Sequence, residues 1–389
     1  MFRAFRLSIL TLTVIICTFS AQAQTYQTLY AFTRPRDGST PFATVIRDQT
    51  GFLYGTTFQG GPGGACAPIG CGEVYRVNPT TGQKVLFHAF ADTDGKFPRG
   101  VLLRDNNGSL FGTASTGGSS GSGVVFKIDS AGTYTVLHNF TGGTDGGLAY
   151  SGLIHDAAGN LYGTTLMGGT FNAGVIYRIN TAGNFKVLYN FNKSVDGGSP
   201  SAALFRDSAG NLYGTTSSAG VGTAGTVFKI APTGQYTVLY SFTGGSDGGN
   251  PDSGLLRDPA GNLYGIAPVA GDLSCAAPSG CGVAFKIDNT GHFSVLHTFT
   301  GTPDGRLPEG RLTRDAAGNL YGTTLGGGTE DRGTIFKIDA VGNYSVIHSF
   351  QVSLGEGYEG TGVILDNLGN LYGATMGGPC CGTVFKFTP

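Results

Sequence analysis

Short apolar segments alternate along the chain with clusters of Gly, Asp, Asn and Pro. In one representative stretch, β-branched and aromatic residues occupy residues 203–206, 212–216, 226–230 and 236–242. Turn-forming residues fill the gaps between them, as in Asp207-Ser-Ala-Gly-Asn211 and Pro232-Thr-Gly234. No segment after the first 23 residues keeps a 3.6-residue apolar period. The pattern therefore predicts an all-β protein built from units of four short antiparallel strands.

The units repeat at a nearly constant interval. Leu-Tyr-Gly, with one Leu-Phe-Gly variant, places its glycine at positions 55, 112, 163, 214, 265, 322 and 373, which differ by 57, 51, 51, 51, 57 and 51. The two longer intervals follow units whose loops carry widely spaced cysteine pairs, so they are six-residue insertions. A period near 50 is typical of propellers and other repeat arrays.

The two ends of the repeat region favour a closed ring. Residues 26–32 match the fourth strand of a unit, and residues 383–387 match the third. The seventh unit therefore lacks a fourth strand that the N-terminus can supply, which would remove exposed strand edges. An open array would instead carry capping repeats. We predict one seven-bladed β-propeller domain over residues 24–389, closed by its N-terminal strand.

The repeated motifs also carry a family resemblance. Asp-x-x-Gly-Asn-Leu-Tyr-Gly-Thr-Thr, followed by Val-Phe-Lys-Ile-Asp and Val-Leu-Tyr-Ser-Phe, resembles the GloVer tandem repeat and, more loosely, NHL-type propellers. The resemblance implies a propeller in an exported bacterial protein. Members of that family carry various C-terminal anchors, whereas this chain ends at its last strand, so release rather than attachment is expected. The resemblance implies no particular activity.

Composition and the N-terminus point to export. Arg3 and Arg6 precede a largely apolar stretch over residues 7–19 and the small-x-small site Ala21-Gln22-Ala23, which predicts a signal peptide cleaved after residue 23. We expect a secreted or periplasmic monomer with no membrane span after cleavage. Glycine accounts for 68 of 389 residues and the net charge is −1, without basic runs. Nucleic acid is therefore excluded as the main partner.

The cysteines fit an oxidising compartment. Cys17 lies in the signal peptide, and the other six form three close pairs: Cys66 and Cys71, Cys275 and Cys281, Cys380 and Cys381. No His stands near these pairs in sequence, so disulfides are favoured over zinc. Local pairing is slightly favoured, although a bond between adjacent cysteines closes a small ring. Cross-linking of the first and last blades stays open as an alternative.

Most polar residues recur in the same slot of every unit, which indicates a structural role. Asp48 and its six equivalents open the first hairpin turn, and a Lys or Arg recurs on the third strand. Four of the six His share a fourth-strand slot with Tyr in other units, so a His-centred active site is not predicted. We assign no catalytic residue.

The candidate ligand-binding residues lie on the loops of one face. An acid followed by Gly recurs between the fourth strand and the next unit, and the loop after the second strand adds two acids. The set is Asp37, Asp94, Asp145, Asp196, Asp247, Asp304, Glu356, Glu330 and Asp331. An acidic ring at a channel mouth could bind a cation or basic groups, although Asp-Gly is also simply a good turn. No cofactor or metal is predicted; calcium stays open.

The leading hypothesis is a non-catalytic binding module for an extracellular glycan or protein on this loop face. The alternative is a propeller hydrolase or lyase that acts on extracellular polysaccharide through clustered carboxylates. A carboxylate pair about 5–10 Å apart would favour the enzyme. A purely structural envelope component is the third possibility.

Overall fold

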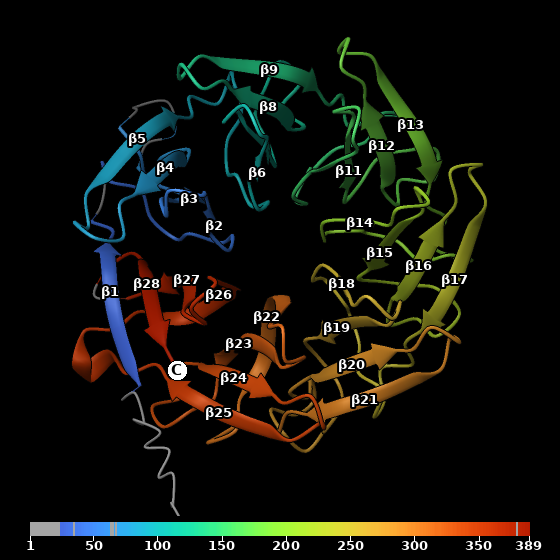
Figure 1. Ribbon diagram of the computed structural model, residues 1–389. Helices are drawn as coiled ribbons and strands as arrows, with labels where there is room; N and C mark the ends of the chain where they lie inside the picture. Colours follow the sequence, from blue (N-terminus) through green and yellow to red (C-terminus); the bar gives the residue numbers. More distant parts are fainter. Residues whose placement is uncertain (1–23, 34–35, 63–65, 67, 379) are drawn as a thin grey trace, which may run out of the picture.

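The computed structural model describes residues 24–33, 36–62, 66, 68–378 and 380–389. Seven four-stranded antiparallel sheets surround a common axis, with the first strand of each sheet innermost and the fourth outermost (Figure 1). The predicted all-β, seven-bladed propeller is confirmed. The predicted signal peptide, residues 1–23, lies outside the described residues.

Blades 1 to 3 comprise β2–β5, β6–β9 and β10–β13. Their strands are β2 (Ile46–Arg47), β3 (Leu53–Thr57), β4 (Glu73–Val77), β5 (Lys84–Ala89), β6 (Leu103–Arg104), β7 (Leu110–Ala114), β8 (Val124–Ile128), β9 (Tyr134–Asn139), β10 (Ile154–His155), β11 (Leu161–Thr165), β12 (Val175–Ile179) and β13 (Phe185–Asn190).

Blades 4 to 6 comprise β14–β17, β18–β21 and β22–β25. Their strands are β14 (Phe205–Arg206), β15 (Leu212–Thr216), β16 (Thr226–Ile230), β17 (Tyr236–Ser241), β18 (Leu256–Arg257), β19 (Leu263–Ala267), β20 (Val283–Ile287), β21 (Phe293–Thr298), β22 (Arg306–Arg314), β23 (Leu320–Gly326), β24 (Thr334–Ile338) and β25 (Tyr344–Ser349).

Blade 7 joins the two ends of the chain. It contains β26 (Tyr358–Leu365), β27 (Leu371–Gly377), β28 (Thr383–Thr388) and, as its outermost strand, β1 (Thr25–Ala31), while a short 3-10 helix, η1 (Val352–Leu354), precedes it. Thr25 pairs with Thr388 and Ala31 with Thr383. The predicted closure of the ring by the N-terminal strand is therefore confirmed.

The repeat motif is explained by contacts within each blade. In blade 4, Asp207 Oδ1 accepts the Asn211 backbone N–H at 2.8 Å, and its Oδ2 accepts the Tyr213 hydroxyl at 3.2 Å. Gly214 lies opposite Phe228 on the next strand, and a Cβ at Gly214 would come within 2.7 Å of the Phe228 ring. Asp therefore fixes the turn as predicted, while Gly makes room for the aromatic ring of the third strand.

The first strand of most blades is shorter than the sequence predicts. In blade 4 it covers Phe205–Arg206 rather than residues 203–206. The residues before it are held from the neighbouring blade instead, because Thr164 Oγ1 donates to Pro200 O at 3.2 Å and Thr215 Oγ1 to Ser253 O at 3.3 Å. These segments face the axis of the ring, and we call them the channel segments.

Among the described residues, no helix is long and apolar enough to cross a membrane.

Candidate functional site

The acids of the predicted ring form hydrogen bonds that fix the loops between successive blades. In blade 4, the Asp247 carboxylate accepts the Tyr240 hydroxyl at 3.0 Å and the Thr243 backbone N–H at 2.8 Å. Burial works against ionisation, yet these hydrogen bonds keep the pKa of Asp247 below its usual value. The same arrangement joins each ring acid to a Tyr or His of its own outermost strand: Asp37 to Tyr30, Asp94 to His88, Asp145 to His138, Asp196 to Tyr189, Asp304 to His297 and Glu356 to His348.

The loops that carry the acidic ring, and the aromatic residues beside them, also join neighbouring blades. The Tyr240 ring stacks on Phe293 of the next blade at a centroid distance of 3.8 Å, and Tyr344 donates to the backbone carbonyl of Asp304 at 3.0 Å. The structure therefore places these acids one per blade junction, in contact with the outermost strands. In the part of the chain that the structure describes, no group of three or more His, Cys, Asp or Glu residues could hold a metal ion.

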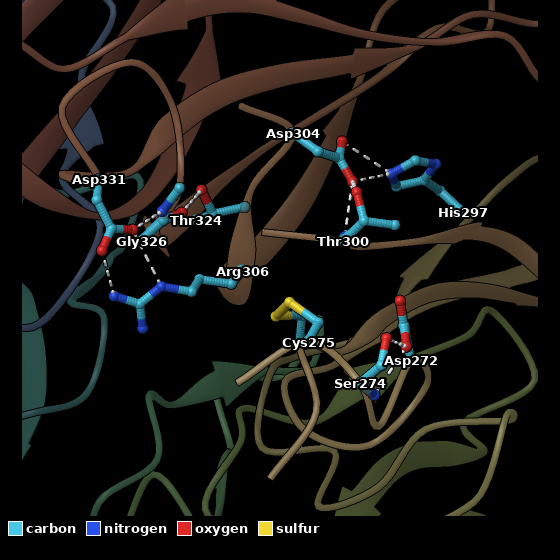
Figure 2. Close-up of a disulfide and its surroundings, with 12 residues drawn as sticks. Asp272, Ser274, Cys275, His297, Thr300, Asp304, Arg306, Thr324, Gly326 and Asp331 are labelled. Atoms are coloured by element: carbon cyan, nitrogen blue, oxygen red, sulfur yellow. Dashed lines mark hydrogen bonds and ion pairs between the residues drawn. A yellow bond between two sulfur atoms is a disulfide. The ribbon is translucent and has the colours of Figure 1, made fainter. Parts of the chain in front are cut away.

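The other two predicted acids also fix loops. Asp331 forms a two-pronged ion pair with Arg306, at 3.0 and 2.9 Å, and accepts the Gly327 N–H at 2.7 Å (Figure 2). Glu330 accepts the Ser353 hydroxyl at 2.5 Å and the Val352 N–H at 2.9 Å. Both acids thus hold the second loop of blade 6 in place.

Blade 1 departs from the ring pattern. Lys84 occupies the slot that holds an aromatic residue in the other blades, and its Nζ donates to Asp37 O at 2.7 Å and to Asp37 Oδ1 at 2.9 Å. Lys84 also forms an ion pair with Glu73, whose side chain is fully buried. Burial raises the pKa of Glu73 to about 7, against the opposing effect of the Lys84 charge. Two ion pairs of Lys84, with Asp37 and Glu73, here replace an aromatic contact.

The three cysteine pairs form local disulfides. These are Cys66–Cys71 in blade 1, Cys275–Cys281 in blade 5 and Cys380–Cys381 in blade 7. Cys275 lies in the loop beside the Asp304–His297 contact (Figure 2). Among the described residues, no disulfide links the first and last blades.

The axis of the propeller contains a cavity that the sequence did not predict. It encloses about 340 Å³ and is lined by the channel segments of all seven blades. One position, which follows a proline in five of the seven units, is different in every blade. We call it the channel slot, and its residues are Phe42, Arg99, Tyr150, Ser201, Asp252, Glu309 and Gly360.

One wall of the cavity combines a guanidinium with aromatic rings. The Arg99 guanidinium lies 4.2 Å from the centroid of the Phe42 ring, 4.7 Å from that of Tyr150 and 5.0 Å from that of Phe58. Within the described residues, its Nε is buried and has no acceptor. This wall offers donors beside apolar faces.

The opposite wall carries two carboxyl groups on neighbouring blades. Asp252 and Glu309 both line the cavity, and burial raises the pKa of each. The charge of Asp252 raises the pKa of Glu309 further, while Arg99 favours ionisation of both. Asp252 Oδ1 is buried with no hydrogen-bond partner in the described part of the chain. Such a pair can accept and donate hydrogen bonds or exchange a proton.

The signal for this cavity was present in the sequence. The ring acids are nearly identical in all units, whereas the channel slot holds seven different residues in a repeat whose second and third strands are regular. Variation at one position of the repeat, rather than a recurring acid, would have identified it.

Comparisons with known proteins agree with this architecture. The extracellular domain of a protein described as a one-component system of B. thetaiotaomicron has a TM-score of 0.59 and 16% identity over 94% of this chain and 42% of that one. The GH74 enzyme of Niastella koreensis has a TM-score of 0.60 and 13% identity over 90% of this chain and 52% of that one. The chain thus spans about half the length of these structures, and the likeness shows the fold alone.

No curated protein matches the chain. The model of the Gloeobacter/Verrucomicrobia repeat matches residues 14–157, 143–316 and 269–389. These matches cover nearly the whole sequence and correspond to the repeated motifs described above. The chain therefore belongs to the Gloeobacter/Verrucomicrobia repeat family.

Proposed function

We propose that this protein is a secreted or periplasmic binding module whose extracellular ligand enters the cavity at the channel axis. One observation carries the proposal: in a repeat whose second and third strands are regular, the channel slot holds seven unlike residues, and six of them line the cavity. Rigid repeats with variable residues at one place are typical of binding sites. The three disulfides fit an oxidising compartment outside the cytoplasm.

The cavity favours a glycan over a protein surface. Its volume of about 340 Å³ is at the small end of ligand pockets, which hold about 300–1,000 Å³. A unit of a sugar chain fits such a space more readily than a folded partner. Sugars also present hydroxyls beside apolar C–H faces, which match the carboxyl groups of Asp252 and Glu309 and the aromatic wall around Arg99.

Glycan retention by the purified mature protein tests this proposal. The protein would be presented with a broad glycan panel, with and without calcium, and the affinity for retained glycans measured by titration calorimetry. Asp252→Asn should weaken binding by about tenfold or more, the size expected for a hydrogen bond to a charged group. The matched control Asp145→Asn alters a ring acid and should leave binding unchanged. Loss of binding only in Asp145→Asn would contradict the proposal and favour the acidic ring.

A second candidate function is hydrolysis of a bound glycan. It is favoured by the Asp252–Glu309 pair, because two carboxyl groups that influence each other in one cavity are suited to general acid and base roles. Mass spectrometry of the retained glycans distinguishes it from binding alone. Products that disappear in Glu309→Gln, while the glycan is still retained, would establish the enzyme; intact glycans would exclude it for those tested.

A further inference from the structure

One of the two arginines that line the channel, Arg311, has no partner in the part of the protein that the structure describes. Arg311 lies two residues beyond the channel slot of blade 6 and lines the cavity described above. It also lines a second cavity of about 350 Å³, which contains later residues of the first strands such as Ile46 and Leu256. Since the first strands run away from the loop face, Arg311 stands between the loop-side cavity and the deeper one.

The surroundings of Arg311 leave its guanidinium free. The equivalent positions in the other blades hold only small or apolar residues: Thr44, Val101, Gly152, Ala203, Gly254 and Gly362. A Cβ at Gly254 would lie 3.5 Å from Arg311 Cδ, so the missing side chain provides space beside the arginine. Across the described residues, Arg311 has no ion pair and no side-chain hydrogen bond, and its side chain is exposed to the solvent of the channel.

The charges of the channel are unevenly matched. The charged residues that line the loop-side cavity are Arg99, Arg311, Asp252 and Glu309. Asp252 and Glu309 interact with Arg99 and with each other, whereas neither carboxyl group affects the pKa of Arg311. Two permanent cations face at most two carboxylates, and burial favours protonation of those carboxyls. The cavity is therefore positive whenever either carboxyl is protonated.

We propose that Arg311 binds a carboxylate of the ligand, so that the glycan taken by the channel is an acidic one that carries uronate residues. This inference rests on the proposed function and adds the chemical class of the ligand. The sugar ring would lie in the loop-side cavity, near the Arg99 wall, and its carboxylate would reach towards the arginine. A planar guanidinium without a protein partner is well suited to pair with a carboxylate through two parallel hydrogen bonds.

Binding of an oligogalacturonide and of its methyl ester tests the inference. The ester keeps the sugar and removes the charge, so native protein should bind the acid about tenfold more tightly or better, as expected for one charge-assisted hydrogen bond. Arg311→Gln should abolish this preference, while Arg311→Lys should retain part of it. Asp145→Asn serves as the matched control and should keep the full preference.

The outcomes separate the two proposals. Equal affinity of native protein for acid and ester would overturn the role of Arg311 but leave glycan binding intact. No binding of any glycan would overturn the proposed function itself, and binding of a peptide carboxylate instead would overturn both. The comparison of acid with ester in native protein needs no variant, so it tests recognition of a carboxylate even if Arg311→Gln fails to fold, and Arg311→Lys then assigns that recognition to Arg311 rather than to Arg99.

Discussion

We predict that Glu309 makes the stability of the protein depend on pH. Burial and the charge of Asp252 raise its pKa, so the folded protein holds a proton that the unfolded chain releases above pH ~4.3. Folding stability contributed at this site must therefore decrease as pH rises from that value. Glu309→Gln should melt like native protein near pH ~4 and be more stable than native by on the order of 1–2 kcal/mol at pH ~9. Thermal melting across pH measures the difference.

Glu330→Gln is the matched control, and its effect on stability should depend on pH in the opposite direction. The Ser353 hydroxyl and nearby backbone N–H groups lower the pKa of Glu330, so its contribution is present above the ordinary glutamate range and lost in acid. Replacing it should reduce stability at neutral pH and have no effect in acid. Parallel melting curves for native protein and Glu309→Gln at all pH values would show that Glu309 is not perturbed by burial.

Gly214 illustrates the steric requirement in the Leu-Tyr-Gly motif. A Cβ there would lie 2.7 Å from Phe228 Cζ and 2.9 Å from Leu204 Cδ2. Gly214→Ala should therefore lower the free energy of unfolding by ~1–3 kcal/mol, measured by urea denaturation. The same substitution should cost less when Phe228 is replaced by Leu, because the clash is relieved. An equal cost in both backgrounds would mean that the backbone, and not the ring, requires glycine.

At the scale of elements, blade 1 shows how an ion pair can take the place of an aromatic contact. Lys84→Tyr leaves the Glu73 carboxyl buried without its partner, which should cost ~3–5 kcal/mol at neutral pH. The double variant Glu73→Thr/Lys84→Tyr restores the residues found in blade 4, where Tyr236 stacks on Tyr189. It should therefore be within about 1 kcal/mol of native protein or more stable. Urea denaturation of the two single variants and the double variant measures this coupling, and additive effects would contradict it.

The strands of the repeat differ in how well the sequence predicts them. Leu212–Thr216 and Thr226–Ile230 are observed with the predicted bounds, because their residues pair within one blade and show a local pattern. The first strand is shorter than predicted, since Thr164 and its equivalents bind the channel segment across a blade junction. Such contacts join residues about 36 positions apart, so they leave no pattern in the local sequence from which they could be predicted.

At the scale of the molecule, the candidate site was harder to predict than the fold. Seven copies of one motif are enough to predict a closed ring of blades. The ring, however, brings together residues from different units, and whether these residues are alike is visible only when all units are aligned. Asp252 and Glu309 belong to different units and meet only at the axis. The recurring acids were conspicuous in the sequence, but they form hydrogen bonds with the outermost strands at the junctions between blades. In this protein, a residue that recurs in every unit therefore indicates a structural role, and a position that differs between units indicates the candidate site.

Closure of the ring leads to a final prediction about the whole molecule. β1 pairs with β28, and its Tyr26 ring packs on His348 and Phe385 at centroid distances of 4.8 and 5.3 Å. Deleting residues 24–33 removes these contacts and leaves β28 as an open edge, which favours aggregation. We expect the melting temperature to fall by ~10 °C or more.

A circular permutant separates the role of the strand from its position in the chain. Thr388 lies opposite Thr25, so a hairpin loop of about two to five residues can join β28 directly to β1, with the new N-terminus near residue 36. Every strand pair of blade 7 is then retained, while the link from β1 to β2 is cut. The permutant should melt within a few degrees of native protein, by calorimetry, and should not aggregate. If its melting temperature is instead as low as that of the deletion variant, closure of the ring depends on the covalent link between the first and last blades and not on strand pairing alone.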